Sequence, residues 1–567
     1  MTAMHTIRRL LDALYGAHGG RAFDRISGIL AAYETRTTGS GRGFSERDVV
    51  LITYGDTLRA GDEQPLGTLH RFAKARLAEA ISAIHLLPFF PYSSDDGFAV
   101  CDYYAVDPAI GDWEMVERCG DDFDLMVDFV LNHISSRSRW FSDYLSEQPG
   151  FTDLAIEVDP TADLSAVVRP RALPLLTPFT KQSGRQVHLW TTFSADQIDL
   201  NYKSVEVLGK MVEVLLFYVS RGARLIRMDA VAYLWKRLGT RCIHLPQTHD
   251  VVRLLRAVLD VVAPDVWLIT ETNVPHAENI RYFGNGTDQA QMVYNFTLAP
   301  LLLHAFTTAD SRVLSKWAAT LTTPSDRTAF FNFTASHDGI GVRPLEGILP
   351  ATEIDRLAGL AEKGGGGVSL RHSAGSGPIP YELNITYVDA MGLAGPWGGA
   401  LHAARFLASQ AIQLCLPGVP GVYLHSLLGS RNWREGVART GQARSINREK
   451  LRLEAVNAAL ADVRNFRSRI FFPYCRMLAV RRQQPAFHPK ADCQVLPLQP
   501  NLFAVKRQAD QQTLFAVTHI GGASVVLNLQ PFGGVGRLHD VLSGRWFEAA
   551  RVPVNAYQAV WLTPGVA

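Results

Sequence analysis

Charged and imidazole side chains follow several apolar runs in this sequence, at the point where each run ends. The stretch LIRMDAVAYLWK places Arg227 and Asp229 at the end of such a run. In VWLITETN, Glu271 directly follows the apolar residues. The run FFNFTASHD ends in His337 and Asp338. Taken singly, each has an ordinary explanation: an Asp after a strand often caps a helix, a Glu is often solvated, and a His is often a hydrogen-bonded core residue.

A further run, FDLMVDFVLNH, contains Asp128, Asn132 and His133 near its end, and PYSSDDGF carries Asp95 and Asp96. Capping alone explains such a set poorly, because gathering unpaired buried charge on one face of a domain is unfavourable. We therefore interpret these side chains as one catalytic site.

The chemistry that suits this set is glycosyl transfer with retention of configuration. One carboxylate attacks the anomeric carbon, a second donates and later accepts a proton, and a third can hold sugar hydroxyls. Arg227 and Asp229 are two residues apart on one strand, so their side chains share a face. We expect the arginine to lower the pKa of the aspartate, and the proton donor to be a poorly solvated Glu with a raised pKa.

Eight apolar runs could hold these side chains in place, and amphipathic helical patterns separate most of them. Continuous Val, Ile and Leu runs that alternate with helices indicate a parallel sheet, and eight such units predict an α/β fold, a (β/α)8 TIM barrel. The catalytic residues of such a barrel lie at the carboxyl ends of its strands. The eight runs are DVVLITY, AISAIHLLPFF, FDLMVDFVLNH, ARLIRMDAV, VWLITETN, MVYNF, FFNFTASHD and GVPGVYLHS.

Composition divides the chain further. Residues 1–45 read as an N-terminal helical segment, which becomes polar and Gly-rich at its end, and residues 46–487 as the catalytic barrel. Two long stretches without strong periodicity, 134–205 and 343–398, are predicted to be functional insertions of the kind called B and B′ subdomains. From residue 488 to 567, short alternating runs between turn residues predict a separate all-β domain.

The bulk composition is ordinary for a globular chain: 47% of the 567 residues are hydrophobic, 19% are charged, and the formal net charge is +2. That balance argues against a protein that binds nucleic acid through bulk charge. The six cysteines show no metal-binding spacing and are expected to be free thiols. We see no signal peptide and no apolar run long enough to span a membrane, so we expect a cytoplasmic protein without a membrane or nucleic-acid partner.

The motifs RMDAV, ITETN and SHDGIG, together with DFVLNH, resemble the strand motifs of the α-amylase superfamily, the family 13 glycoside hydrolases. The resemblance implies that Asp229 is the nucleophile, Glu271 the general acid and base, and Asp338 the transition-state stabiliser. It also implies that the side chains around the same glucosyl ring are Arg227, His133 and His337.

Five further stretches resemble the sucrose phosphorylase group within that superfamily: HLLPFFPYSSDDGF, DPAIGDW, LWTTFSADQIDLN, YELNITY and GQARSINRE. The resemblance implies that Asp95 and Arg444 hold the far hydroxyls of glucose, that Phe193 packs on the sugar, and that Gln197 lines the site. It also implies inorganic phosphate as a substrate, no metal and no organic cofactor, and a monomer or a homodimer.

Four features depart from the sucrose phosphorylases and look more like glucosylglycerate phosphorylases. They are a longer N-terminal segment and the stretches VRPLEGIL, GSGPIPYE and HSLLGSRNW. Glycerate is anionic, so a cation near the acceptor would help to bind it, and Arg343 and Arg431 are candidates by position. Each could equally form an ion pair within the protein. Tyr381 and Glu382 lie in the expected acceptor loop, where a structural role for Tyr381 is an alternative.

The expected function is thus a retaining α-glucosyl phosphorylase that acts on 2-O-α-glucosyl-D-glycerate. Phosphorylases of sucrose, glucosylglycerol or sucrose 6-phosphate remain alternatives. The general motifs alone also permit a hydrolase or transglucosidase. A sugar-binding protein without activity is a third interpretation, which the presence of all three carboxylates disfavours.

Overall fold

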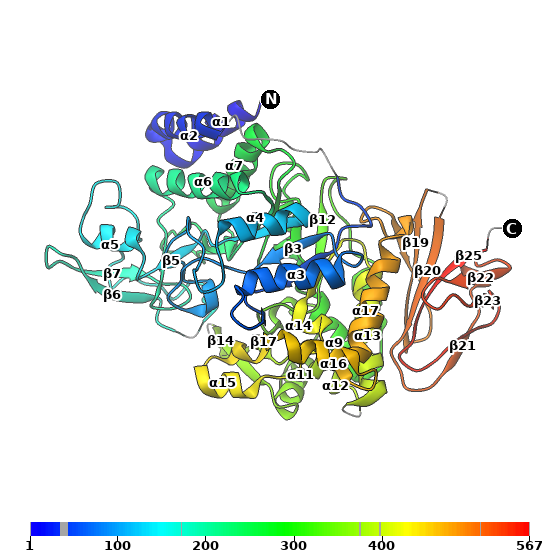
Figure 1. Cartoon of the computed structure of the whole chain (residues 1–567). Helices are drawn as coiled ribbons and strands as arrows, with labels where there is room; N and C mark the ends of the chain where they lie inside the picture. The colour runs from blue at the N-terminus through cyan, green and yellow to red at the C-terminus, as the bar shows by residue number, and fades with distance from the viewer. Residues whose placement is uncertain are drawn as a thin grey trace.

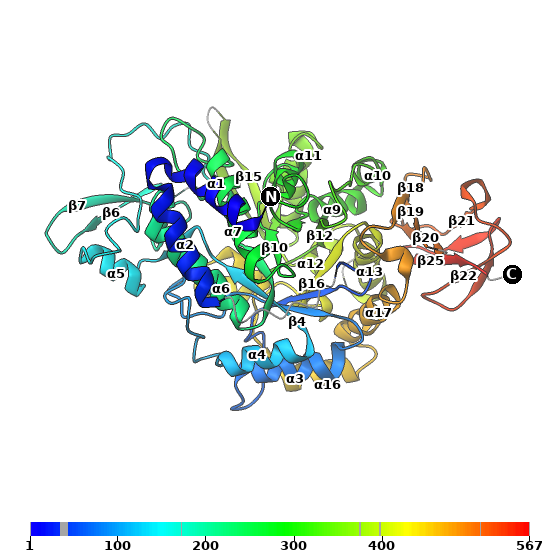
Figure 2. The same cartoon turned by 90° about the horizontal axis from the view of Figure 1, so that it is seen from above.

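A closed barrel of eight parallel strands forms the centre of the computed structural model, which describes residues 2–33, 43–171, 173–373, 376–395, 398–510 and 512–565 (Figures 1 and 2). All eight predicted runs contribute one strand each, so the predicted (β/α)8 barrel is confirmed. In order around the barrel the strands are β1 (Val50–Thr53), β16 (Val419–Tyr423), β12 (Ala329–Phe333), β11 (Met292–Tyr294), β10 (Trp267–Thr270), β9 (Ala223–Met228), β4 (Asp124–Phe129) and β3 (Ala83–Leu86).

The strands are almost completely buried because side chains fill the barrel inside and helices cover it outside. The strands are short and parallel, so the turns that follow them all lie at the same end of the barrel, the carboxyl end. The helices between and after the strands include α3 (Pro65–Leu77), α4 (Trp113–Asp122), α6 (Val205–Ser220), α7 (Pro246–Val262), α9 (Leu298–Thr308), α10 (Arg312–Ala318), α13 (Gly399–Cys415), α16 (Leu453–Ala461) and α17 (Phe466–Arg481).

Two helices at the N-terminus pack on the outside of the barrel (Figure 1). Helix α1 (Ala3–Tyr15) begins after Thr2, whose side chain caps it, and lies on α7. Helix α2 (Gly19–Tyr33) lies on α6. Each buries one apolar stripe, as its amphipathic sequence predicts. Most of the polar stretch TRTTGSGRGFS, namely residues 35–42, lies outside the described residues.

The first insertion is more regular than its Pro-rich sequence indicates. Its ends are joined where β5 (His133–Ser135) pairs antiparallel with β8 (Gln197–Asp199). Between them lie helix α5 (Arg139–Leu145) and a hairpin of β6 (Leu176–Thr180) and β7 (Gln186–Trp190). This hairpin extends away from the barrel in Figure 1.

The second insertion also has regular structure, although its Gly-rich sequence suggested little. Helix α11 (Ala351–Lys363) is followed by β14 (Gly367–Ser373) and β15 (Ser376–Asn384), which pair with β13 (Ile340–Gly341) in a three-stranded sheet. Helix α12 (Tyr387–Gly392) leads back toward α13. Of this insertion, residues 374, 375, 396 and 397 lie outside the described part.

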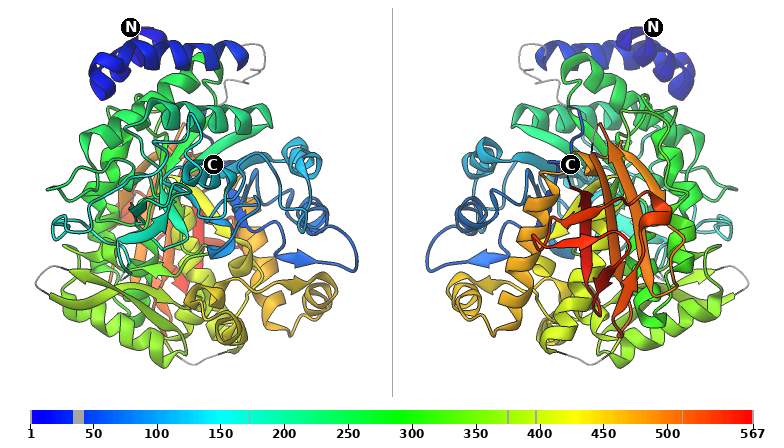
Figure 3. Two further views of the ribbon diagram at one scale, coloured as in Figure 1. Left: turned by 90° about the vertical axis from the view of Figure 1, so that its left-hand side faces the viewer. Right: turned by 90° about the vertical axis from the view of Figure 1, so that its right-hand side faces the viewer.

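The C-terminal region forms an antiparallel sheet beside the barrel, shown on the right of Figure 1 and face-on in the right view of Figure 3. The all-β character predicted from residue 488 onward agrees with it. The six-stranded sheet has the order β18 (Asp492–Val495), β19 (Leu502–Ala509), β20 (Gln512–His519), β25 (Ala559–Pro564), β22 (Arg537–Asp540) and β23 (Trp546–Glu548), with β21 (Val525–Leu527) and β24 (Val552–Val554) as a separate pair.

Among the described residues, every helix is too short or too polar to cross a bilayer.

Candidate active site

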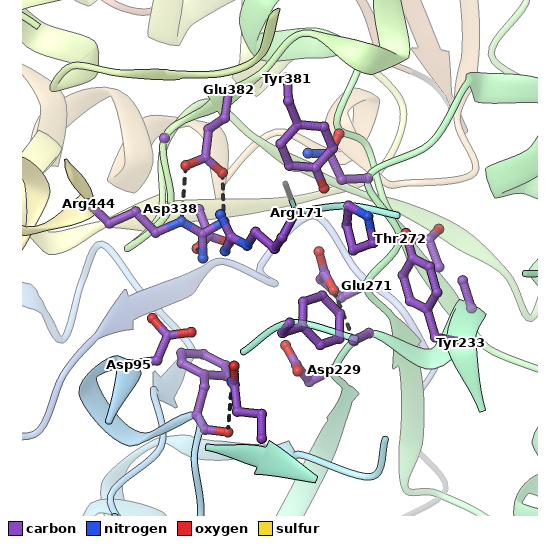
Figure 4. A pocket seen from close by; sticks show the side chains of 18 of the residues that line it. Asp95, Arg171, Asp229, Tyr233, Glu271, Thr272, Asp338, Tyr381, Glu382 and Arg444 are labelled. Atoms are coloured by element: carbon purple, nitrogen blue, oxygen red, sulfur yellow. Dashed lines mark hydrogen bonds and ion pairs between the residues drawn. The ribbon is translucent and has the colours of Figure 1, made fainter. Parts of the chain in front are cut away.

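A pocket opens at the carboxyl ends of the barrel strands. It encloses about 730 Å³ of empty space, counting the part open to solvent. Figure 4 shows the carboxylates of Asp229 and Glu271, which follow β9 and β10, pointing into this space. The expected site residues that line it are Asp95, His133, Phe193, Gln197, Asp229, Glu271, His337, Asp338, Tyr381, Glu382 and Arg444.

Arg227 lies beneath the pocket and orients Asp229. It is only 2% exposed, and its Nη1 donates a hydrogen bond of 2.9 Å to Oδ1 of Asp229. The same atom forms an ion pair with Asp128. Oδ2 of Asp128 lies 2.8 Å from Nε2 of His85, and both side chains are fully buried. This chain of contacts holds the carboxylate of Asp229 in one orientation.

The main chain after Asp229 holds Glu271. The backbone N–H of Ala230 donates a hydrogen bond of 3.0 Å to Oε2 of Glu271. Ala230 has a φ of 50°, in the left-handed region that few residues with a side chain adopt. The turn that begins at Asp229 therefore also fixes the position of the Glu271 carboxylate.

Burial raises the pKa of Asp229 to about 7. Arg227 lowers this pKa, but the neighbouring carboxylates of Asp128 and Asp338 raise it. Burial likewise raises the pKa of Glu271 to about 7. Arg227 thus lowers the pKa of Asp229 as expected, but burial outweighs the arginine and the net pKa is raised. The charge of Asp229 also raises the pKa of Glu271, so the two carboxyl groups titrate together.

Arg444 approaches Asp338 from the opposite side. Its Nη1 lies 2.5 Å from Oδ1 of Asp338. The same guanidinium binds Glu382 with two hydrogen bonds of 3.0 and 2.6 Å. Glu382, on β15, is 1% exposed, and Arg444 lies in a short 3₁₀ helix, η7 (Ala443–Asn447). Two late segments of the chain thus complete this side of the pocket.

A strained turn after β3 carries Asp95 into the pocket. Asp95 and Asp96 have φ values of 54° and 47°, and Gly97 has a φ of 110°. A Cβ at Gly97 would lie 2.6 Å from the carbonyl oxygen of Pro88, so only glycine fits. Arg448, which sequence analysis missed, donates a hydrogen bond of 2.6 Å to Asp96 and lies 3.6 Å from Asp95.

The two histidines are almost completely buried, and Nε2 of His337 lies 3.2 Å from Oδ1 of Asp338. Nε2 of His133 is 2.9 Å from the carbonyl oxygen of Phe98 and 3.2 Å from Nε2 of Gln197. The ring of His337 stacks on Phe98 with centroids 4.6 Å apart. Burial lowers the pKa of both histidines, and nearby arginines lower that of His337 further. Both rings are therefore neutral near pH 7 and can hydrogen-bond a sugar without adding charge.

We call His133, Asp229, Glu271, His337 and Asp338 the floor of the pocket. Each follows a barrel strand within a few residues, so the barrel itself sets its position.

We call Arg171, Phe193 and Tyr381 the rim, because they come from the two insertions. The ring of Phe193 lies 5.2 Å from that of His133 and 5.6 Å from that of Tyr233. Arg171 lines the pocket, yet its guanidinium forms no hydrogen bond or ion pair with the described residues. Sequence analysis missed Arg171, Tyr233 and Asn273 as lining residues; for Arg171 the triplet RPR in a functional insertion was the available signal.

Arg343 and Arg431 do not line the pocket. Arg343 is 4% exposed and lies behind Tyr233, whose pKa is raised by burial and lowered by this arginine. Arg431 forms an ion pair with Asp389, and its guanidinium lies 5.4 Å from the ring centroid of Phe466. The expectation that Arg431 faces the acceptor is wrong, because the carboxylate of Asp389 holds it elsewhere.

The pocket thus combines two carboxyl groups with raised pKa values, a third carboxylate beside an arginine, and an arginine at the rim without a partner among the described residues. Such a set can transfer a glycosyl group to or from an anionic acceptor. Within the described part of the chain, no cluster of three or more His, Cys, Asp or Glu residues could hold a metal ion.

Known proteins match this chain over most of its length. A profile of the α-amylase catalytic domain matches residues 79–339. The glucosylglycerate phosphorylase of Spirochaeta thermophila is 45% identical over 588 residues, which cover 100% of this chain and 99% of that protein. The sucrose phosphorylase of Agrobacterium vitis is 30% identical over 437 residues, which cover 73% of this chain and 85% of that protein.

The fold also matches a solved structure. The crystal structure of sucrose 6F-phosphate phosphorylase from Thermoanaerobacter thermosaccharolyticum aligns with a TM-score of 0.73 and 24% identity, over 84% of this chain and 94% of that one. The fold is therefore shared with that protein over most of this chain.

Proposed function

We propose a phosphorolytic activity for this chain, because it belongs to the α-amylase family and, within it, to the group that holds the glucosylglycerate phosphorylases. The reaction is the reversible cleavage of 2-O-α-glucosyl-D-glycerate by phosphate, which yields α-glucose 1-phosphate and D-glycerate. The enzyme is a hexosyltransferase that retains the α configuration through a covalent β-glucosyl intermediate.

The choice of glucosylglycerate rests on one observation, the identity of 45% along the entire chain to a protein of that activity. The match to a sucrose phosphorylase is 30% and covers 73% of this chain. The first similarity therefore includes the insertions and the N-terminal helices.

In the first half-reaction, Asp229 attacks the anomeric carbon while Glu271 gives its proton to the glycosidic oxygen. The bond from C1 to that oxygen breaks, D-glycerate leaves, and a bond from C1 to Oδ of Asp229 forms. The 2.9 Å hydrogen bond from Arg227 supports the role of Asp229, because it orients the attacking carboxylate. The raised pKa of Glu271 supports its role as the proton donor.

In the second half-reaction, a phosphate oxygen attacks C1 from the side that glycerate left. The phosphate proton passes to Glu271, and the bond from C1 to Asp229 breaks. Two inversions restore the α configuration, and Glu271 is protonated again for the next cycle.

We assign the residues around Asp338 to the glucosyl ring. Asp95, Asp338 and Arg444 supply charged partners for its hydroxyls, and the neutral His133 and His337 add hydrogen bonds. The ion pair between Arg444 and Asp338 supports this role, because groups that are already oriented can bind the transition state without rearranging.

We assign the acceptor side to the rim. Arg171 supplies a guanidinium that has no partner in the part of the chain that the structure describes, which suits the glycerate carboxylate and the attacking phosphate in turn. Tyr381 lies beside it and Arg343 lies behind Tyr233, so both can act on the acceptor through neighbouring side chains. We place Phe193 against the apolar face of the sugar.

We propose a cytoplasmic enzyme that needs neither a metal nor an organic cofactor. The described cysteines are all free thiols, which supports a reducing compartment. The active site is formed by a single chain, which is compatible with a monomer or a homodimer.

Sucrose phosphorolysis is the second candidate, because the sucrose phosphorylase of Agrobacterium vitis reaches 30% identity. Fructose is neutral, so this alternative leaves the unpaired guanidinium of Arg171 to phosphate alone.

The test is the reverse reaction. α-Glucose 1-phosphate is supplied with D-glycerate, fructose, fructose 6-phosphate, glycerol or no acceptor, and phosphate release is followed. We expect fast release with D-glycerate only. Fast release with fructose would make the chain a sucrose phosphorylase, and equal release in every tube would indicate a hydrolase.

A further inference from the structure

A second cleft lies on the face of the barrel opposite the active site, between helices α1 and α7, which lie side by side in Figures 1 and 2. It encloses about 830 Å³ of empty space, counting the part open to solvent. Thr287 and Asp288 precede β11, and Arg327 precedes β12, so this cleft is at the amino ends of the strands. It is therefore separate from the pocket at their carboxyl ends.

Four arginines and two aspartates line this cleft, which leaves it with a formal charge of +2. The two aspartates compensate two of the arginines. Nε of Arg253 lies 3.1 Å from Oδ2 of Asp288, and Nε of Arg256 lies 3.0 Å from Oδ1 of Asp260. Arg256 is 1% exposed and also binds the carbonyl oxygen of Val266 over 2.7 Å, so it is a fixed part of the wall.

The other two arginines, Arg9 and Arg327, have no such compensation. Neither guanidinium forms an ion pair or hydrogen bond with any residue that the structure describes. Burial lowers the pKa of Arg256, Asp260 raises it, and the charge of Arg327 lowers it, as expected of two nearby cations that repel one another. A dianion in the cleft would relieve that repulsion.

The cleft is built from two regular helix faces. Ala3, Thr6 and Arg9 recur every three residues along α1, and Arg253, Arg256, Ala257 and Asp260 recur at helical spacing along α7. Because α1 packs on α7, both stripes are held in fixed positions. The spacing therefore presents guanidinium groups from two helices and one turn to a common space.

We propose that this cleft binds a phosphate monoester of the size of a sugar phosphate. Planar guanidinium groups pair with phosphate oxygens through two parallel hydrogen bonds, and two unpaired arginines match a dianion. The hydroxyls of Thr6 and Thr287, together with the carboxylates of Asp260 and Asp288, can bind the hydroxyls of the sugar. The volume exceeds what inorganic phosphate alone would fill.

The test counts binding sites on the full-length protein by isothermal titration and equilibrium dialysis with glucose 6-phosphate, with glucose as the neutral control. The double variant R9S/R327S removes the two uncompensated cations. R452S/R464S is the matched control, because it removes two exposed arginines elsewhere. We expect wild type and the control to bind one more molecule of glucose 6-phosphate than R9S/R327S does. At that site the loss of affinity should be about 100-fold or more.

Turnover of α-glucose 1-phosphate with D-glycerate should be unchanged in R9S/R327S, since neither residue touches the active site. Should the double variant fold poorly, T287E places a carboxylate at the exposed edge of the cleft and should abolish the same site. An equal number of sites in wild type, R9S/R327S and T287E would overturn the proposal. The count is a difference between proteins, so it is valid whether or not the active site turns over glucosylglycerate.

Discussion

The floor and the rim of the pocket differ in how their side chains are held. Asp229 accepts a hydrogen bond from Arg227, which is itself paired with Asp128, and Asp338 is paired with Arg444. Arg171 at the rim has no such partner among the described residues. The floor is therefore organised before substrate arrives, whereas the rim is completed by the group that it binds.

That contrast matches two chemical tasks. The floor must stabilise the same transition state in both half-reactions, so preorganised charge is an advantage. The rim must accept glycerate and phosphate in turn, and a guanidinium without a fixed partner can bind either anion. Substitutions on the two sides should therefore affect different kinetic constants.

The largest effect is expected from D229N, which removes the attacking carboxylate of the floor. We expect kcat to fall by about 10⁴-fold to 10⁶-fold, since the covalent intermediate can no longer form. Steady-state phosphate release in the reverse reaction measures it. A loss of less than 10-fold, in a protein with normal circular dichroism, would contradict the assignment.

The next effect tests whether the floor depends on the contacts beneath it. D128N leaves the buried Arg227 without its second carboxylate, and we expect kcat/KM to fall by about 100-fold. Because the charge of Asp128 raises the pKa of Asp229, its removal should also move the acidic limb of the pH profile to lower pH. A purely structural role would lower activity but leave that limb in place.

R171A tests the rim. We expect KM for phosphate, for D-glycerate and for α-glucose 1-phosphate to rise by about 10-fold to 100-fold, because each places an anionic group beside Arg171. R169A is the matched control, because Arg169 is two residues away and does not line the pocket. If R171A and R169A behave alike, the rim does not hold the anions.

The pH profile tests the two carboxyl groups of the floor that titrate together. The active form has Asp229 ionised and Glu271 protonated, and both pKa values are raised to about 7. We expect kcat/KM to be highest near pH 7 and to fall on both sides. A profile that is flat from pH 5 to 9 would exclude this pair as the source of the proton.

The smallest effect is on stability. Between about pH 4 and pH 7 the folded protein holds protons on the floor that the unfolded chain has released, so these carboxyl groups lower stability as pH rises. E271Q removes the part of this dependence that is due to Glu271. We expect its melting temperature to exceed that of wild type by a few degrees at pH 8 and to equal it near pH 4. An unchanged difference across this range would show that the pKa of Glu271 is not raised.

The floor could be predicted from sequence because parallel strands bring their carboxyl ends together, and each apolar run marks one such end. The rim could not, because its residues come from insertions whose fold follows from tertiary packing. Arg171 follows no periodic element, and Arg431 was misplaced because its partner Asp389 lies 42 residues earlier. The hairpin of β6 and β7 was missed for the same reason. The net pKa of Asp229 required its burial, which sequence alone does not provide.

The ladder between β5 and β8 makes the first insertion an exchangeable module. Ser135 pairs with Gln197 and His133 with Asp199, so the chain leaves and re-enters the catalytic domain at two neighbouring strands. The entropic cost of closing a loop between fixed ends rises only slowly with the length of the loop. A different segment can thus replace the insertion between these strands and bind a different leaving group, while the catalytic carboxylates keep their positions.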